Sequence, residues 1–122
     1  MIVGGIISLI SEALLTGERA GVSKEKMAAI IQKGSGQTKV MEVFGPNIFK
    51  NTPEEVTFSL FNMKKDLNLY RNLAENAGIP TMASESARQL YQIAEYLQKG
   101  QQDATAVFDI IAQLGIEEKT RV

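Results

Sequence analysis

The side chains available for chemistry in this sequence are mainly carboxylates and amines, because it contains neither histidine nor cysteine. The commonest general base and metal ligand are therefore missing, and thiolate or disulfide chemistry is excluded. Acidic pairs stand at residues 54–55 and 117–118, but adjacent residues of a helix do not face one another. We interpret both pairs as helix-start or solvated charges. Glu12 interrupts an apolar stretch; it marks where that stretch emerges into solvent, or it pairs with a basic residue such as Arg19.

Lys65 lies in the middle of a second apolar face of a predicted helix. The first face is the regular core-facing stripe, with residues spaced by three and four: Leu60, Met63, Leu67, Tyr70, Ala74 and Ala77. The second face has the same spacing on roughly the opposite side: Phe58, Phe61, Lys65 and Leu69. Because a small domain needs one buried stripe per helix, the second face indicates a surface that meets something else. The alternative is a helix packed between two neighbours, with Lys65 extending to water.

The composition fits one folded domain of ordinary make-up. The chain has 122 residues, of which 44% are hydrophobic and 22% are charged. Its 13 basic residues nearly balance its 14 acidic ones, so there is no electrostatic footprint for nucleic acid. The lack of cysteine fits a reducing compartment, and we expect a cytoplasmic protein with no metal site and no membrane partner. No phosphate-binding loop is present, since residues 34–36 (Gly-Ser-Gly) lack both a third glycine and a preceding strand.

The first half of the chain predicts three helices. Residues 1–15 form an apolar run that is too short to span a bilayer and lacks the charged start of a signal peptide. Gly4 and Gly5 in this run allow close approach of another backbone. Because the run opens without a polar lead-in, we expect the chain to be cut from a longer protein whose first helix continues upstream. Ser23 caps a helix over residues 24–33, and a short helix over 38–43 is expected to stop at residues 45–46 (Gly-Pro).

The second half predicts three more helices. Residues 52–55 (Thr-Pro-Glu-Glu) combine a capping box with proline at the first helical position, so we expect the helix to run from there to Ala77, with residues 56–57 able to break its first turn. Residues 78–80 (Gly-Ile-Pro) end it. Thr81 or Ser84 then caps a helix that ends at Gly100. Asp103 caps the last helix, which closes at Gly115. No alternating strand pattern is present, so the expected fold class is all-α, with six helices.

The segment around Lys65 resembles that of a known enzyme family. The pattern Phe58-x-Leu60-x-x-x-x-Lys65-Asp66-Leu67-x-Leu69 is similar to the lysine–aspartate segment in the C-terminal domain of β-hydroxyacid dehydrogenases. That family includes 3-hydroxyisobutyrate dehydrogenase, tartronate semialdehyde reductase and glyoxylate/succinic semialdehyde reductase, and it is related to 6-phosphogluconate dehydrogenase. Further segments resemble the family in the same order: residues 5–14, 18–21, 35–36, 77–80, 87–91 and 103–107.

The resemblance implies that this chain is one part of an enzyme. Residues 1–122 would form a single helical C-terminal domain, a six-helix bundle like that of 6-phosphogluconate dehydrogenase. The N-terminal Rossmann domain, which binds NAD or NADP in the family, is absent. So are the family's catalytic lysine and asparagine at the start of the interdomain helix. The chain is thus expected to be the substrate-side and oligomerisation domain of an NAD(P)-dependent dehydrogenase, with no catalytic residue and no cofactor of its own when isolated.

The resemblance also implies candidate contacts to the cofactor. In the family, the residues matching Phe58 and Lys65 approach the nicotinamide end of the cleft between the domains. There a lysine offers positive charge to the cofactor ribose, the carboxamide region or the substrate carboxylate, and an aromatic ring shields the hydride path from water. Asp66 matches the family's aspartate; we interpret it first as an orienting or structural acid and second as a cofactor contact. Lys64 is expected to face solvent, and Phe61 to pack between domains.

Two other function classes remain open on the sequence alone. One is a free-standing helical module whose second apolar face binds a protein, which requires a native start at Met1. The other is a structural dimerisation domain, which overlaps with the enzyme interpretation because family members usually assemble through their C-terminal helices. A homodimer is expected both for the enzyme domain and for a structural dimerisation domain. The identity of the hydroxyacid and the choice between NAD and NADP lie outside what the residues indicate.

Overall fold

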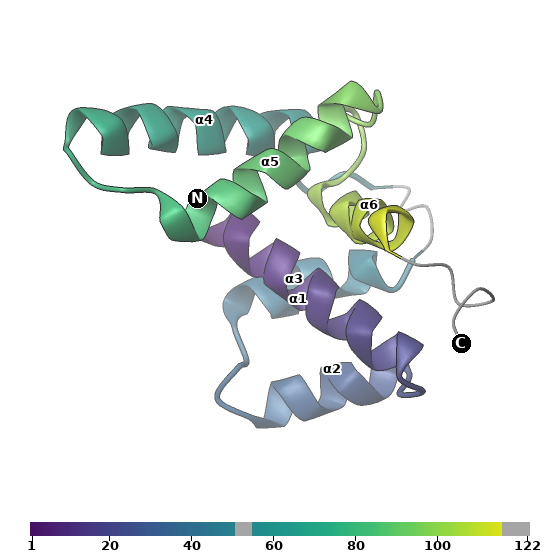
Figure 1. The fold of residues 1–122 in the computed structure, drawn as a ribbon. Helices are drawn as coiled ribbons and strands as arrows, with labels where there is room; N and C mark the ends of the chain where they lie inside the picture. Colours follow the sequence, from purple (N-terminus) through teal and green to yellow (C-terminus); the bar gives the residue numbers. More distant parts are fainter. Residues whose placement is uncertain (51–54, 116–122) are drawn as a thin grey trace.

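The computed structural model describes residues 1–50 and 55–115 of the chain. These residues form six α-helices and one short 3-10 helix, with no β-strand among them (Figure 1). In chain order the elements are α1 (Ile2–Arg19), α2 (Lys24–Lys33), α3 (Lys39–Ile48), α4 (Leu60–Asn76), α5 (Met82–Tyr96), η1 (Ala104–Ala106) and α6 (Val107–Leu114). The all-α prediction is confirmed. None of the helices in the described part is long and apolar enough to cross a membrane.

Side-chain caps set several helix starts, as the sequence predicts. The Ser23 hydroxyl accepts a hydrogen bond from the Lys26 amide at 3.2 Å, and α2 begins directly after it. The Asp103 carboxylate accepts from the Thr105 amide at 3.1 Å, so it caps η1, the 3-10 turn that leads into α6, and not the last α-helix itself as predicted. Each cap satisfies an amide that the first turn of a helix leaves without an internal partner. Just after the C-terminal end of α4, Gly78 has a φ of 73°. This is the left-handed conformation with which many helices end.

The prediction that residues 45–46 end the third helix is wrong. Helix α3 continues through Pro46 to Ile48, although proline cannot donate the hydrogen bond that a helix interior normally contains. The last turn is retained because it buries Phe44, Asn47 and Ile48, while Pro46 itself lies exposed. Burial of two large apolar side chains stabilises the turn by about 3–6 kcal/mol, enough to offset the lost hydrogen bond.

Two further helix boundaries differ from the prediction. Helix α4 begins at Leu60 after Ser59, so Phe58 is not part of it; most of the expected start at residues 52–55 lies outside the described residues. Helix α5 ends at Tyr96 and not at Gly100, because Gln98 adopts a φ of 61° and reverses the chain. A non-glycine residue in this conformation is uncommon, and the sequence carries no signal for it.

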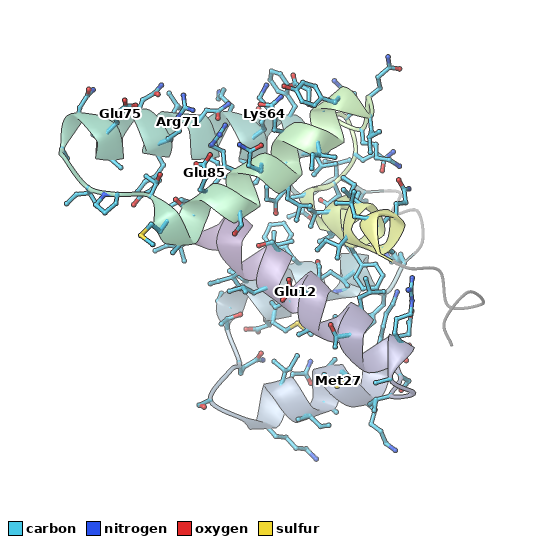
Figure 2. The ribbon with its side chains drawn as sticks, viewed as in Figure 1. Glu12, Met27, Lys64, Arg71, Glu75 and Glu85 are labelled. Carbon is cyan, nitrogen blue, oxygen red and sulfur yellow. The ribbon has the colours of Figure 1, made fainter. Side chains whose placement is uncertain are left out.

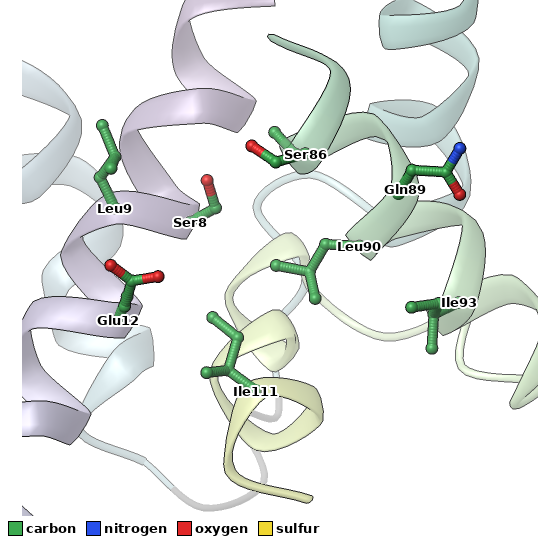
Figure 3. Close-up of a pocket in the computed structure, with 9 residues that line it drawn as sticks. Ser8, Leu9, Glu12, Ser86, Gln89, Leu90, Ile93 and Ile111 are labelled. Carbon is green, nitrogen blue, oxygen red and sulfur yellow. The ribbon is translucent and has the colours of Figure 1, made fainter. Parts of the chain in front are cut away.

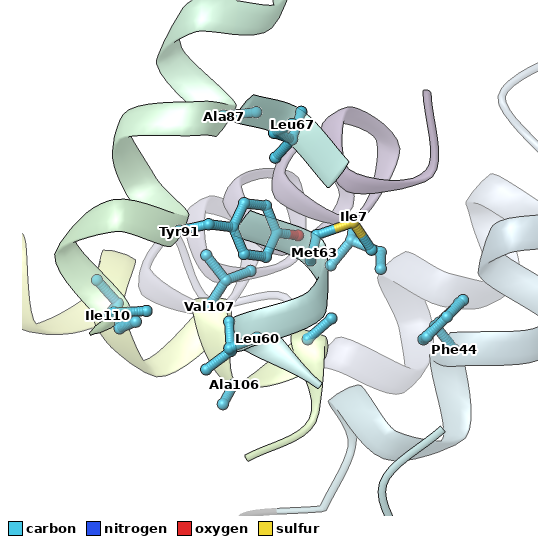
Figure 4. Packing of buried hydrophobic residues seen from close by; sticks show 12 residues of the cluster. Ile7, Phe44, Leu60, Met63, Leu67, Ala87, Tyr91, Ala106, Val107 and Ile110 are labelled. Atoms are coloured by element: carbon cyan, nitrogen blue, oxygen red, sulfur yellow. The ribbon is translucent and has the colours of Figure 1, made fainter. Parts of the chain in front are cut away.

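The hydrophobic core consists of two clusters, and α1 contributes to both. The first lies between α1, α4, α5 and α6, with the ring of Tyr91 at its centre (Figure 4). The second lies between α1, α2, α3 and α6 and includes Leu14, Met41 and Phe108. Helix α1 runs diagonally through the molecule, with α2 and α3 on one side and α5 on the other (Figure 1). The start of α1 is therefore held in a fixed place relative to α4 and α5.

The expected close approach at the α1 glycines is found at one of them. A Cβ added at Gly4 would lie 2.9 Å from the Met63 sulfur, so a side chain of α4 packs directly on this glycine. A Cβ added at Gly5 would meet nothing within 4 Å. Gly4 thus allows the α1–α4 contact, and Gly5 faces open space.

Candidate functional site

Helix α4 has one buried and one exposed apolar face. Leu60, Met63 and Leu67 are buried in the first core cluster. On the other side, Phe61 is 47% exposed and Leu69 is 59% exposed. Helix α4 lies along the upper edge of the molecule and packs on α5 (Figure 1). The alternative of a helix packed between two neighbours is therefore wrong for the described chain, and the second face is available to a partner.

Phe58 is held just before α4 by its own backbone. Its amide donates to the Asp103 carboxylate at 3.2 Å, and its carbonyl accepts from the Ala104 amide at 2.7 Å. The spacing predicted that Phe58 is part of the helix, which is wrong. These two bonds take the place of helical hydrogen bonds and hold Phe58 outside the helix. The side chain is half-buried against the first core cluster.

A pocket of about 300 Å³ lies where the start of α1 meets the start of α4. Its lining residues are Met1, Val3, Phe44, Phe58, Met63 and Asp66. The walls are mostly apolar, including two phenylalanine rings, and Asp66 supplies a charged side chain. Such a surface suits a flat, weakly polar ring that carries a hydroxyl group nearby.

The structure brings together two of the three predicted site residues. Phe58 and Asp66 both line the pocket, whereas Lys65 is exposed on α4 and is not among its lining residues. Within the described residues neither Lys65 nor Asp66 has a hydrogen-bond or ion-pair partner. Asp66 lines the pocket, and both interpretations of it, as an orienting or structural acid and as a cofactor contact, stay predictions.

The pocket also contains residues that the sequence did not single out. Val3 and Phe44 come from α1 and α3, far from the lysine–aspartate segment in the chain. Both have the spacing of ordinary core residues, and only the packing of α3 against α1 brings Phe44 to this position. No local signal could have identified them.

The prediction that Lys64 faces solvent is wrong. Its side chain is only 18% exposed and forms an ion pair with Glu95 of α5. Glu95 also accepts a hydrogen bond from Gln92 at 3.2 Å. The hydrogen bond from Lys64 holds the pKa of Glu95 below its ordinary value. Lys64 therefore connects α4 to α5 (Figure 2). Its neighbour Lys65 is exposed.

A second polar connection joins the same two helices. Arg88 of α5 pairs with Glu85 one turn earlier and donates to the Asn68 side chain of α4 at 3.2 Å. The hydrogen bond from Arg88 lowers the pKa of Glu85. Together with the Lys64 pair, this connection fixes α5 along the inner side of α4 and leaves the second face of α4 outside.

A groove of about 370 Å³ lies between α1, α5 and α6 (Figure 3). Leu9 and Glu12 of α1 form one side, Leu90 and Ile93 of α5 the other, and Ile111 of α6 the end. Leu9 is 67% exposed. Glu12 is exposed and has no ion-pair partner among the described residues, so it marks the emergence of the apolar helix into solvent.

Comparisons with known proteins agree with this fold. Residues 1–111 match the family described as "NAD-binding of NADP-dependent 3-hydroxyisobutyrate dehydrogenase". The chain belongs to this family. It is 27% identical over 117 residues to a probable mitochondrial 3-hydroxyisobutyrate dehydrogenase from Dictyostelium discoideum, covering 91% of this chain and 36% of the relative. It is 28% identical over 110 residues to the cytokine-like nuclear factor N-PAC from Aedes aegypti, covering 88% of this chain and 19% of that protein.

The fold of this 3-hydroxyisobutyrate dehydrogenase family member also matches a solved structure. The crystal structure of 3-hydroxyisobutyrate dehydrogenase from Salmonella typhimurium superposes with a TM-score of 0.80 at 22% identity, over 89% of this chain and 38% of that one. The chain therefore spans less than two fifths of the length of these relatives. The all-α bundle and the membership of the β-hydroxyacid dehydrogenase family, both predicted from sequence, are confirmed.

Proposed function

We propose that this chain is the substrate-side and oligomerisation domain of an NAD(P)-dependent β-hydroxyacid dehydrogenase of the 3-hydroxyisobutyrate dehydrogenase type. It packs against an N-terminal Rossmann domain of the same parent chain and closes the active-site cleft. The observation that carries the proposal is the apolar pocket at the start of α1, which joins Phe58 and Asp66. The family match over residues 1–111 and the greater length of the relatives support it.

The residues of the pocket fit the nicotinamide end of the cofactor. Phe44, Phe58 and Met63 offer apolar contact to a flat ring, and Asp66 accepts hydrogen bonds from hydroxyl groups. The sequence holds no glycine-rich loop for the pyrophosphate, so the remaining cofactor contacts belong to the other domain. When bound, the cofactor supplies hydride transfer. Phe58 excludes water from that region, and Lys65, exposed on α4, attracts the carboxylate of a hydroxyacid.

The second face of α4 supports the proposed contact between domains. Phe61, Leu69 and Leu73 are exposed on it, and Leu73 is 68% accessible. Exposed apolar side chains grouped on one helix are a common feature of surfaces that a partner covers. The Rossmann domain is the proposed occupant of this face.

The groove between α1, α5 and α6 supports self-association. Ile2 and Leu9 are each 67% exposed on α1, and Leu9 lines this groove. A second copy related by a two-fold axis would bury these side chains on both partners at once. This is the oligomerisation role in the proposal.

The activity test uses two proteins, the chain of residues 1–122 and the full-length protein that contains it. Titration of the chain with NADPH, by fluorescence or calorimetry, is expected to give a Kd above about 1 mM and no turnover of 3-hydroxyisobutyrate or succinic semialdehyde. The full-length protein is expected to oxidise or reduce a β-hydroxyacid or its semialdehyde. Micromolar binding or turnover by the chain alone would overturn the domain role.

The upstream coding sequence and a protein-binding assay test the alternative of a free-standing helical interaction module. The nuclear-factor name of the N-PAC relative, together with the exposed face of α4, favours that alternative. A coding sequence that starts natively at Met1 and a chain that binds a protein through Phe61 and Leu69 would support the module. A glycine-rich βαβ unit and a lysine–x–x–x–asparagine pair directly upstream would support the enzyme.

A further inference from the structure

We propose that Asp103 is a positioning residue of the cleft, acting through Phe58. The proposal rests on the function proposed above, because it assigns Phe58 to the wall of the active-site cleft. Asp103 lies outside the lysine–aspartate segment, and the sequence alone identified it as a helix cap. The structure gives its carboxylate a second set of partners that a cap does not need.

Asp103 is buried, with 2% of its surface exposed, and both carboxylate oxygens are used. Oδ2 accepts from the Thr105 amide at 3.1 Å and from the Thr105 hydroxyl at 2.5 Å. Oδ1 accepts from the Thr57 amide at 2.8 Å and the Phe58 amide at 3.2 Å. A buried carboxylate requires such donors, because burial without them is costly. Here the donors come from two segments more than forty residues apart in the chain.

Capping accounts for only one of these two oxygens. Oδ2 alone accepts the hydrogen bond from the first turn of η1. The hydroxyls of Ser23 and Ser59 do the same for α2 and α4, each with a single oxygen. Oδ1 is directed to the segment before α4. Its bonds determine where the backbone of residues 57 and 58 lies, and therefore where the Phe58 ring meets the pocket.

Backbone hydrogen bonds make this attachment rigid. The Ala104 amide donates to the Phe58 carbonyl at 2.7 Å, and the Leu60 amide donates to the Gln102 carbonyl at 2.9 Å. Ser59 and Asp103 thereby form an antiparallel bridge. Phe58 is anchored at both its amide and its carbonyl, next to an acid, Asp66, that lines the same pocket. The Asp103 carboxylate thus fixes one wall of the cleft relative to the start of α1.

The matched variants are Asp103→Asn and Thr105→Val. Asp103→Asn keeps the shape of the side chain but leaves one oxygen for four donors, so the Thr57–Phe58 contacts weaken. Thr105→Val removes the hydroxyl bond to the same carboxylate and leaves residues 57 and 58 untouched. In the chain of residues 1–122, amide hydrogen exchange is expected to accelerate at Thr57 and Phe58 in Asp103→Asn and to stay unchanged there in Thr105→Val. Equal protection of these two amides in all three proteins would overturn the positioning role.

Kinetics of the full-length enzyme test the consequence for the cleft. Asp103→Asn is expected to lower kcat about 10–100-fold with a smaller change in KM, because displacement of a group at the reacting centre by about 1 Å has effects of this size. Phe58→Leu should lower kcat similarly, and the double variant should be no slower than Phe58→Leu alone. Additive losses, or an equal loss in Thr105→Val, would overturn the proposal. A wild-type enzyme inactive on all β-hydroxyacids would instead overturn the proposed function, while the exchange measurement would still decide the position of Phe58.

Discussion

Tyr91 shows how a single side chain fixes the start of α1. Its ring is fully buried, and its hydroxyl donates to the Gly4 carbonyl at 3.2 Å. Burial raises the pKa of this phenol, because the charged form would lose its hydration. In the unfolded chain the phenol titrates near its ordinary pKa of 10.0. The neutral form stabilises the fold, so this contribution is present below pH 10 and is lost as the pH rises above it.

We therefore expect alkaline destabilisation that depends on Tyr91. Above pH 10 the free energy of unfolding should fall by about 1.4 kcal/mol per pH unit because of this residue. Tyr91→Phe should lose about 1 kcal/mol at neutral pH, from the missing hydrogen bond, and should lack this part of the pH dependence. Urea unfolding of both proteins between pH 8 and about 11.5 is the measurement. Parallel pH profiles for the two proteins would contradict the assignment.

Lys64 and Lys65 form a natural pair of variants, because Lys64 pairs with Glu95 whereas Lys65 is exposed and is a proposed site residue. In the full-length enzyme, Lys65→Ala is expected to lower kcat/KM roughly 10–1000-fold, about 1.4–4 kcal/mol of transition-state stabilisation, with little change in melting temperature. Lys64→Ala should lower the melting temperature through loss of the Glu95 pair and leave kcat/KM nearly unchanged. Steady-state kinetics and thermal unfolding of both variants test this. A similar loss of activity in the two would refute the choice of Lys65.

At the scale of elements, the contact between α1 and α4 depends on the absence of a side chain at Gly4. Gly4→Ala is expected to destabilise the chain by about 1–3 kcal/mol, since the new Cβ would meet the buried Met63. Gly5→Ala adds the same methyl group in open space and should stabilise the helix by about 0.5–1 kcal/mol. Chemical denaturation of the two variants gives both values. Changes of the same sign would show that the packing at Gly4 is looser than described.

The helices were predictable wherever their ends are set by neighbouring residues. Ser23 and Gly78 act through hydrogen bonds within one turn and were identified correctly. Two of the boundaries that differ are decided by distant contacts. Burial of Phe44 carries α3 past Pro46, and the bond from Phe58 to Asp103 delays the start of α4. The residues next to these boundaries do not indicate the continuation of α3 or the late start of α4.

For the whole molecule, the exposed apolar part of α1 predicts self-association. The chain of 13.4 kDa is expected to form a dimer at micromolar concentration. Leu9→Asp should give a folded monomer, because Leu9 is 67% exposed. Ile10→Asp is the contrasting variant and should unfold the chain, since Ile10 is 7% exposed in the second core cluster. Sedimentation equilibrium with circular dichroism separates the cases, and a monomeric wild type would refute the interface.

The candidate site is less predictable than the fold, because helices from different parts of the chain pack together to form it. The lysine–aspartate segment pointed to Phe58, Lys65 and Asp66, and two of these line the pocket. The remaining walls come from α1 and α3, whose residues Val3 and Phe44 have no chemical character that distinguishes them from core residues. Their contribution depends on how three separate helices pack, which periodicity does not encode.

The bridge between Ser59 and Asp103 makes the α4–α5 hairpin a modular part of the chain. The two ends of the hairpin lie side by side, since the Ala104 amide nitrogen is 2.7 Å from the Phe58 carbonyl oxygen. Changes in its length at the exposed turn of residues 77–80 therefore need not alter the chain path before Thr57 or after Thr105. A longer turn at residues 77–80 would add outer surface there, while Phe58, Met63 and Asp66, at the opposite end of α4, would keep the pocket unchanged.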